Sequence, residues 1–333
     1  MLKEIEIQNF RCFEQIKISG FERLNLICGK NNAGKTALLE AIFLNVVPKP
    51  SSILILRKLR REPLEAIKAM PNRAWDNLFY VREKDKSIVI VGNKENNTIR
   101  VEIQVEINSL KSSLILKSRR QEDLSSWRST KVPAGDLRNF RISASQVPIV
   151  PSFIMISGRE LTEAYDNARL DDKDSEVLKA FQILDPAIES VESFSIGEPT
   201  LYLRRKGEKR LPLSLFGDAM NRVAYIMLKM VNNEHKVLLI DEIENGIHYT
   251  SQRDFWRVLF RLAVELDTQI FATTHSLEML QAFADVGLEP NQECSSAYFE
   301  MAKKWKTDQI IGIRRDLETL NYALEHQEGV RGE

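Results

Sequence analysis

Polar and apolar residues alternate over the first part of the chain, with the period of a β-strand that buries one face. The alternation runs from Leu2 to Phe10, resumes after a turn that carries two aromatic residues, and returns on both sides of Gly92–Asn97, a segment typical of a hairpin turn. Strands joined by short turns pair antiparallel. The pattern therefore predicts an N-terminal antiparallel sheet, with strands near residues 2–10, 13–18, 88–91, 99–107 and 112–116.

Much of the remaining chain alternates between short apolar runs and longer stretches in which apolar residues recur every three or four positions. The first pattern is typical of buried strands and the second of helices on a sheet, so together they predict a largely parallel sheet covered by helices. Strands are expected near residues 24–28, 152–156, 201–203, 211–213, 237–240, 269–272, 298–301 and 310–313. Helices are expected near residues 36–45, 160–184, 220–231, 255–266, 277–284 and 317–324. Residues 51–80 are mixed, and the polar residues 117–145 predict a surface excursion.

One strand and one helix of this series flank a glycine-rich segment, GKNNAGKT, at residues 29–36. The segment fits the pattern G-x-x-x-x-G-K-[ST], and the order strand, glycine-rich turn, helix is the context that a phosphate-binding loop requires. In such a loop the backbone N–H groups and the helix N-terminus surround a polyphosphate, the lysine reaches the β- and γ-phosphates, and the hydroxyl binds Mg²⁺. The sequence therefore predicts a nucleotide site. Its residues would be Asn31, Asn32, Ala33, Gly34, Lys35 and Thr36, with Thr36 also on the metal.

Two carboxylates, Asp241 and Glu242, directly follow the apolar run of residues 237–240. A phosphate loop needs an acid at the end of a second strand, where it holds Mg²⁺ directly or through water, and Asp241 has that place. Glu242 can orient and polarise the attacking water as a general base. The alternative is a buried strand that merely ends in two acids, and the phosphate loop upstream favours the catalytic interpretation.

His275 follows the next predicted strand, within the sequence ATTHS. It is therefore expected at the carboxyl end of the sheet, where open α/β folds bind ligands and where its imidazole can contact the γ-phosphate. A single histidine is more often structural, and that is the expectation for His235 and His326. For His248 the two interpretations stay open, with a slight lean towards function.

Composition narrows the possible partners. Lys and Arg together number 47, as do Asp and Glu, so the net charge is zero and a globally basic nucleic-acid-binding protein is disfavoured. Local basic clusters at residues 57–61, 117–120 and 204–210 are expected to be solvated loops rather than binding surfaces. Three widely spaced cysteines give no disulfide or metal pattern. The N-terminus lacks the pattern of a signal peptide, and no apolar run is long enough to span a bilayer, so a cytoplasmic protein is expected.

The phosphate loop with Asn31, the Asp-Glu pair and the Thr-His-Ser segment resemble the ATP-binding-cassette (ABC) class of ATPases. The opening Asn-Phe-Arg resembles the RecF and SMC-like branch of that class. Three longer segments are similar to stand-alone AAA ATPases of the overcoming-lysogenization-defect (OLD) type, which include ATPase subunits of bacterial anti-phage systems; they are LPLSLFGDAMNRVAYIM, VLLIDEIENGIHY and TQIFATTHSLEML. The resemblance covers nearly the whole chain. It implies an α/β fold of the ABC-ATPase type, with a mixed, largely parallel sheet, an N-terminal antiparallel sheet and an inserted helical lobe.

The same resemblance implies that ATP and Mg²⁺ are the cofactors, and that ATP lies in a head-to-tail dimer between the phosphate loop of one subunit and the signature segment of the other. The signature segment would be Ser214–Asp218, with Ser214 and Gly217 on the nucleotide. Three features depart from the family pattern. Ser214 and Gly217 are one residue farther apart than in transporters, and Ala219 stands where relatives often have a second glycine. Residues 157–159 are Ser-Gly-Arg, where transporters have a glutamine.

A single ABC-type ATPase domain is expected over residues 1–333. Residues 1–157 would form the phosphate-loop lobe with the antiparallel sheet, residues 158–190 the helical insertion, and residues 191–333 the part with the signature, the acids, His275 and the C-terminal strands and helix.

The favoured function is an ATP-dependent switch or sensor subunit of an anti-phage system, a homodimer or higher oligomer that controls a separate effector protein. The effector would be a toxin or a nuclease, including a nuclease of the TOPRIM type. A nuclease would be a separate protein, because too few residues follow Ser276 to form a TOPRIM domain in this chain. One alternative is a RecF-like repair or recombination ATPase that acts on DNA itself. A third interpretation, the nucleotide-binding subunit of a membrane transporter, is disfavoured by the signature.

Overall fold

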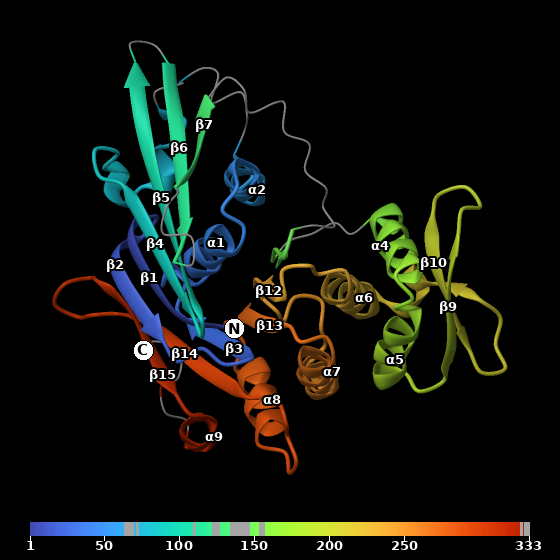
Figure 1. Ribbon diagram of the computed structural model, residues 1–333. Helices are drawn as coiled ribbons and strands as arrows, with labels where there is room; N and C mark the ends of the chain where they lie inside the picture. Colours follow the sequence, from blue (N-terminus) through green and yellow to red (C-terminus); the bar gives the residue numbers. More distant parts are fainter. Residues whose placement is uncertain are drawn as a thin grey trace. The chain divides into compact units, whose positions relative to one another are not determined.

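The computed structural model describes residues 1–62, 70, 73–108, 111–121, 127–133, 147–152, 157–326 and 329 (Figure 1). The chain forms two compact units. The first consists of residues 1–142, 297–315 and 329–333, and the second of residues 143–296 and 316–328. Along the chain, the first unit is therefore followed by the second, and the last two strands belong to the first unit again.

The first unit contains the antiparallel sheet that the alternating pattern predicts. Its strand order is β2-β1-β4-β5-β6-β7, and every neighbouring pair is antiparallel. In β1, Ile5 and Ile7 are fully buried and Glu6 between them is half-buried, as expected for a strand with one buried face. The strands are β1 (Leu2–Phe10), β2 (Phe13–Ser19), β4 (Ile88–Lys94), β5 (Asn97–Asn108), β6 (Lys111–Arg120) and β7 (Arg128–Pro133).

Helix α1 (Lys35–Val46) packs against β1, β4 and β5 of this sheet. At the contact Asn45 is fully buried, and its Nδ2 donates a hydrogen bond to the carbonyl oxygen of Ile99 at 2.9 Å. Gly92 of β4 lies so close to Asn45 that a Cβ atom on Gly92 would overlap the Asn45 side chain. Gly92 is therefore a strand residue at a close approach, and the hairpin turn is only Glu95–Asn96 instead of the expected Gly92–Asn97.

The phosphate-loop strand and helix have the expected positions in the first unit. β3 (Leu24–Gly29) is buried along its whole length and lies beside the antiparallel pair β14 (Ser296–Lys303) and β15 (Ile310–Arg315), in the order β15-β14-β3. A helix that the sequence did not predict, α2 (Pro50–Leu59), follows α1. Pro50 occupies its first position, where a helix does not need the N–H that proline lacks, so this proline begins a helix.

The expected surface excursion over residues 117–145 is wrong for two stretches. Residues 117–120 complete β6, and residues 128–133 form β7. β7 lies at the edge of the sheet with only Val132 buried, so its sequence lacks the alternation that reveals a strand. The strand expected at residues 152–156 falls, except for Ser152, outside the described residues.

The second unit contains the parallel strands. β12 (Val237–Ile240) pairs in parallel with β13 (Gln269–Thr273) on one side and β8 (Ile149–Val150) on the other. The ring centroid of Trp256 lies 4.9 Å from that of Phe283, and Trp256 Nε1 donates to Met279 O at 3.2 Å. These contacts join two helices and fix the start of the second, just after His275. The helices of this part are α6 (Asp218–Val231), α7 (Gln252–Glu265), α8 (Leu277–Gly287) and α9 (Leu317–Glu325).

Two helices and a small sheet form the rest of the second unit. α4 (Gly158–Leu170) and α5 (Asp174–Leu184) confirm the helical pattern at residues 160–184, and they pack on the antiparallel sheet β11-β10-β9. Tyr165 Oη donates to Val191 O at 2.6 Å and thereby joins α4 to β9. The strands are β9 (Ile188–Phe194), which the sequence did not predict, and β10 (Thr200–Arg205) and β11 (Leu211–Pro212), which lie where two strands were expected and pair antiparallel.

Two expectations from composition are also addressed by the structure. Cys12, Cys28 and Cys294 are all free thiols. In the described part of the chain, no helix is both long and apolar enough to cross a membrane.

Candidate functional site

The phosphate loop is shaped by two glycines that no other residue can replace easily. Gly29 ends β3, and a Cβ atom there would lie 2.5 Å from Met301 O of the neighbouring strand. Gly34 has the left-handed φ of +89°, and a Cβ atom there would lie 2.8 Å from the ring of Phe13. The start of β2 therefore packs against the loop, and the two glycines of the motif are required by contacts that the motif alone does not reveal.

The loop leads directly into α1, and the start of this helix suits an anion. Its N-cap residue, Gly34, offers no side chain to the first N–H groups, and the first turn contains no acidic residue. The backbone N–H groups and the positive end of the helix dipole are thus left for a ligand. Asn31 and Asn32 are exposed, Ala33 is buried, and Thr36 is half-buried in the first turn.

Lys35 closes the loop on itself. Its Nζ donates to Gly29 O at 2.6 Å and to Lys30 O at 3.1 Å, so the ammonium group lies across the loop. A polyphosphate would meet a preplaced positive charge and a set of N–H donors. These residues fit the phosphates of a nucleotide, as the sequence predicts.

Replacing Gly34 by alanine should weaken nucleotide binding strongly. The left-handed backbone alone costs about 1–2 kcal/mol for an alanine, and the new Cβ would also force Phe13 to move. Nucleotide affinity and the unfolding midpoint can both be measured. Gly207→Ala is a matched control, because Gly207 has a similar φ of +75° with nothing within 4 Å of an added Cβ. Equal effects of the two substitutions on nucleotide affinity would contradict this role of Gly34.

The second unit carries the two acids, at the end of β12. Asp241 is buried, with 8% of its surface exposed, and its Oδ1 accepts a hydrogen bond of 2.6 Å from the Thr273 hydroxyl. The same hydroxyl oxygen accepts a hydrogen bond of 2.9 Å from the backbone N–H of Glu242. Thr273 is the last residue of β13, so one side chain at the end of the neighbouring strand fixes both acids.

Glu242 differs from Asp241 in exposure and in backbone conformation. Its side chain is half-buried, and its φ of +48° lies in the left-handed region that a residue with a Cβ rarely adopts. Asn245 Nδ2 donates to Glu242 Oε2 at 2.9 Å and to Ser152 O at 3.0 Å, so the carboxylate is held in one orientation. Backbone strain of this kind gathers at functional sites.

Arg222 of α6 ties that helix to the acids. Its Nη2 donates to Asp241 O at 3.3 Å and to Glu242 O at 3.0 Å. Burial lowers the pKa of the Arg222 guanidinium, and the nearby carboxylates, first that of Glu244, oppose this shift. In the expected signature segment, residues 214–217 directly precede α6 and Asp218 is the first residue of this helix. The buried side chain of Arg222, in the same helix, therefore links the signature segment to the acids.

Replacing Arg222 by alanine should destabilise the second unit by about 2–4 kcal/mol, because it removes a buried charged donor from two carbonyl oxygens. The midpoint of urea unfolding measures the loss. Arg261→Ala is the control: Arg261 is an exposed residue of α7 that pairs with Glu265, and its loss should cost less than about 1 kcal/mol. If both variants unfold at the same urea concentration, the buried contact is not important for stability.

His275 lies two residues beyond Thr273, with about half of its side chain exposed. Its Nδ1 is 2.8 Å from Glu244 Oε1, and its backbone N–H donates to the same oxygen at 2.9 Å. The structure thus brings Asp241, Glu242 and His275 to the ends of two adjacent parallel strands, in the second unit, while the phosphate loop belongs to the first.

Several residues of this site were missed in the sequence. All but Asn245, which binds Glu242 three positions away, contact a predicted site residue from a distant part of the chain. Only Glu244 left a signal, as a third acid three positions after Asp241. The missed residues are Arg222, Glu244, Asn245 and Thr273.

The expected signature segment is accessible. Ser214 is exposed in a 3-10 turn (Leu213–Phe216), and Gly217 follows with a φ of +89° and open space around its Cα. α6 then begins at Asp218, without a side-chain cap. Arg159 is exposed in the first turn of α4.

The remaining histidines have local partners. His248 is exposed, its Nδ1 lies 2.8 Å from the Thr250 hydroxyl, and its ring lies 4.4 Å from that of Tyr249. His326 stacks on Tyr322 with 3.9 Å between ring centroids. His235 contributes its backbone N–H to Asn233 Oδ1 at 3.0 Å.

Residues of all three basic clusters are engaged within the fold instead of lying free in loops. Arg57 is buried at the end of α2, where it also donates to Ala74 O, and residues 117–120 belong to β6. Ion pairs with neighbouring acids reduce the positive charge that these clusters present to a partner. The pairs are Arg57–Glu62, Arg60–Glu40, Arg204–Glu189, Arg205–Asp185 and Arg210–Glu192.

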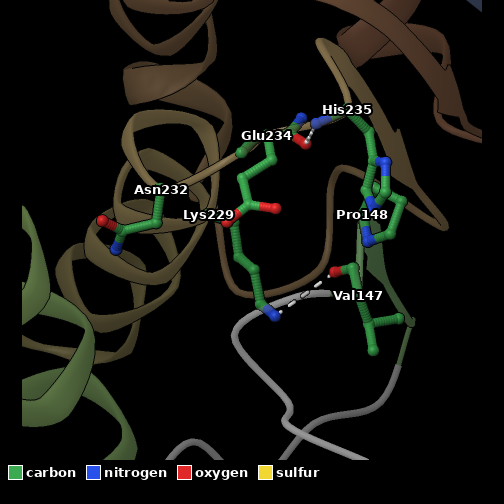
Figure 2. A pocket seen from close by; sticks show the side chains of 7 residues that line it. Val147, Pro148, Lys229, Asn232, Glu234 and His235 are labelled. Atoms are coloured by element: carbon green, nitrogen blue, oxygen red, sulfur yellow. Dashed lines mark hydrogen bonds between the residues drawn. The ribbon is translucent and has the colours of Figure 1, made fainter.

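A pocket lies at the other end of β12 from Asp241. Figure 2 shows it, lined by residues 147–148, Lys229 and residues 232–235. Lys229 is buried and donates to Val147 O at 3.3 Å, and burial lowers its pKa to about 8. The carboxylate of Glu160 opposes this shift. Because the pocket precedes β12 and the acids follow it, the pocket is separate from the candidate site.

The lowered pKa of Lys229 predicts a pH dependence of stability. An unfolded lysine titrates near 10.5, so between pH 8 and 10.5 the unfolded chain binds more protons at this position than the folded chain. Stability should therefore rise with pH across this window, by about 3 kcal/mol from Lys229 alone. Unfolding midpoints from pH 7 to 10 should show this rise in the wild-type protein and in Lys206→Met, an exposed control, and should lack it in Lys229→Met. An unchanged profile in Lys229→Met would contradict the assignment.

The chain is similar to several known proteins. The family described as AAA ATPase domain matches residues 1–147 and 159–280. A Helicobacter pylori protein named ATP/GTP phosphatase is 24% identical over 385 aligned positions, which cover 100% of both chains. The DNA replication and repair protein RecF of Lactococcus lactis is 49% identical, but only over 41 residues, which are 12% of this chain and 11% of RecF.

A solved structure of the Smc head bound to the C-winged helix domain of ScpA aligns over 96% of this chain and 98% of that chain, with a TM-score of 0.52 and 11% identity. This likeness concerns the fold, and it confirms the expected α/β fold with mixed sheets and helices. The family match covers most of the chain. The chain therefore belongs to the AAA ATPase domain family and is an ATP-hydrolysing enzyme.

Proposed function

We propose that this ATPase is a nucleotide-dependent switch that binds Mg-ATP, closes into a dimer and passes its state to a separate protein. The observation that carries the proposal is the arrangement around Thr273. Asp241 is buried on the Thr273 hydroxyl, while Glu242 next to it offers a half-exposed carboxylate from a left-handed backbone. A sheltered metal ligand beside an accessible base is the pair that nucleotide hydrolysis requires.

The phosphate loop would bind the nucleotide. The N–H groups of residues 31–34 surround the phosphates, and Lys35 exchanges its bonds to Gly29 O and Lys30 O for the β- and γ-phosphates. Thr36 and Asp241 would hold Mg²⁺. When bound, this ion neutralises part of the phosphate charge.

Glu242 and His275 would act on the γ-phosphate. Glu242 orients the attacking water and accepts its proton, and the bond from Asn245 fixes the carboxylate before ATP binds. His275 contacts an oxygen of the transferred phosphoryl group and stabilises its charge.

A second copy of the chain would complete the site. Ser214 and Gly217 are exposed immediately before an uncapped helix, so they offer a hydroxyl and a helix N-terminus to the nucleotide of the partner. Because Arg222 of the same helix binds the carbonyl oxygens of Asp241 and Glu242, closure of the dimer would affect the position of the two acids.

The output would be a cytoplasmic effector protein, a nuclease or toxin of an anti-phage system, which the switch releases or activates as ATP turns over. The support is the similarity of the segments around Ser214, Asp241 and His275 to stand-alone ATPases of the OLD type. A switch can pass on its state only through different contacts in its ATP and ADP forms.

The test is to express the chain with its genomic neighbours and to isolate it by affinity, as wild type and as Glu242→Gln. The proposal predicts a second protein in the complex, in amounts that differ between the two. Isolation of the chain alone in both cases would contradict it.

A second candidate function, direct action on nucleic acid, is favoured by the tip of the β14–β15 hairpin. Trp305 is 97% exposed there and lies among Lys303, Lys304 and Lys306. None of these lysines forms an ion pair with the residues that the structure describes, unlike the arginines of β15, where Arg314 binds Glu22 and Arg315 binds Glu300. A free indole with unpaired lysines suits base stacking beside a phosphate backbone.

ATP hydrolysis by the purified protein, measured with and without single-stranded DNA, tests this second function. Stimulation that is lost in Trp305→Ala would favour it over the switch with a protein effector. Trp127→Ala is the control, since Trp127 is a partly exposed tryptophan whose ring carries Arg119 instead of lysines. Equal rates with and without DNA would contradict it.

A further inference from the structure

Glu244 is a buried acid to which neither the sequence patterns nor the proposed roles assign a task. Its side chain is 10% exposed and lies in the loop after β12. One oxygen, Oε1, lies 2.8 Å from the ring Nδ1 of His275 and accepts a hydrogen bond of 2.9 Å from the His275 backbone N–H. The other oxygen, Oε2, is buried and has no hydrogen-bond partner in the described part of the chain. A half-satisfied buried carboxylate is unfavourable for stability, so its position needs another reason.

The contact is not needed to hold the loop in place. Ile243 N already donates to Thr273 O at 2.9 Å, and Asn245 Nδ2 donates to Ser152 O at 3.0 Å. The loop is therefore joined to both neighbouring segments on either side of Glu244. What Glu244 adds is control of the imidazole.

The contact of Nδ1 with Oε1 sets the rotation of the His275 ring and favours one tautomer, while the bond from the backbone N–H holds the same oxygen in place. Nδ1 must carry a hydrogen to donate to the carboxylate, so Nε2 is the nitrogen that faces a ligand. A phosphate oxygen accepts only from an N–H group, so Nε2 must also carry a hydrogen when His275 contacts the γ-phosphate, and the ring acts there as an imidazolium. About half of the His275 side chain is exposed, which leaves that edge of the ring accessible. In metal sites, a carboxylate that accepts a hydrogen bond from one ring nitrogen of a histidine likewise fixes which nitrogen faces the metal.

We propose that Glu244 is the positioning residue for His275 and that it presents Nε2 to the γ-phosphate. This inference rests on the proposed role of His275 in hydrolysis.

A double-mutant cycle tests the proposal, with kcat and KM for ATP measured in Glu244→Ala, in His275→Ala and in the double variant. We expect Glu244→Ala to lower kcat about 10- to 100-fold, as loss of an orienting partner does, with KM changed less than about threefold. In the His275→Ala background, Glu244→Ala should change kcat less than about twofold. The control is Glu265→Ala, an exposed acid on α7 whose loss should leave kcat unchanged in either background.

The tautomer of His275 gives a second readout that does not depend on catalysis. In ¹⁵N-labelled protein, at a pH at which the ring is neutral, the wild type should show hydrogen on Nδ1 of His275. In Glu244→Ala this hydrogen should move to Nε2, the form that a free imidazole prefers. Among the four histidines of the chain, the signal is assigned by its loss in His275→Ala.

The outcomes separate this inference from the proposed function. If the wild type hydrolyses no ATP, the proposed function fails, while the tautomer still shows whether Glu244 sets the ring. If the wild type hydrolyses ATP but the two substitutions multiply in their effects on kcat, Glu244 acts independently of His275 and the inference is overturned. Hydrogen on Nε2 of the neutral ring in the wild type overturns it as well.

Discussion

Replacing Lys35 by alanine is expected to weaken ATP binding at least about 100-fold, which corresponds to about 2.7 kcal/mol. Gly29 O and Lys30 O already hold the ammonium group across the loop. Bonds to phosphate would therefore replace existing hydrogen bonds, and the side chain would lose little additional conformational entropy. Each bond between charged partners contributes about 1.5–3 kcal/mol, and the lysine makes more than one of them. Titration of the folded variant with a fluorescent ATP analogue measures the loss.

Lys30→Ala is the matched control for Lys35→Ala. Lys30 is an exposed lysine of the same loop, and it contributes its backbone carbonyl, which the substitution keeps. Its loss should change ATP affinity less than about threefold, since an exposed charge near a phosphate is well screened. Unchanged affinity in a folded Lys35→Ala protein would contradict the assignment of the loop.

Glu242→Gln is expected to separate binding from hydrolysis. Glutamine keeps the size of the side chain and can still meet Asn245, but it cannot accept a proton from water. We expect kcat to fall by about 10²- to 10⁴-fold, with ATP affinity kept and ATP held in a closed dimer. Single-turnover hydrolysis and the elution volume of the ATP-bound protein measure both effects. Hydrolysis at the wild-type rate would exclude Glu242 as the base.

Asp241→Asn, at the preceding residue, is expected to affect Mg²⁺-dependent binding of ATP instead of hydrolysis. It removes charge from the expected metal ligand while its side chain can still meet the Thr273 hydroxyl. We therefore expect weaker ATP binding in the presence of Mg²⁺ and little change in its absence. His275→Ala should resemble a milder Glu242→Gln, since it removes one contact to the transferred phosphate.

The fold was predictable where residue patterns repeat locally. The alternation in β1, the apolar run of β12 and the helical spacing of α7 each report burial of one face or of both, so their elements were expected correctly. α2 was missed because Pro50 signals a break as readily as a helix start. β7 was missed because an exposed edge strand has no apolar period.

The candidate site was predictable only in its primary residues. Lys35, Asp241 and His275 lie in motifs whose spacing is set by a single strand and the turn after it. Thr273 and Arg222 have their role because distant segments meet, and the sequence does not say which strand will lie beside β12 or which helix will reach its end. A contact between residues far apart in sequence produces no local hydrophobic periodicity from which it could be predicted.

The central claim is that the phosphate loop and the two acids act on the same ATP. The most direct test measures γ-labelled ATP that stays with the protein through gel filtration, for Glu242→Gln alone and together with Lys35→Ala. The account predicts stable retention in Glu242→Gln, near one ATP per chain, and its loss in the double variant. Equal retention in both proteins would show that Lys35 and Glu242 serve different sites, and would contradict the account.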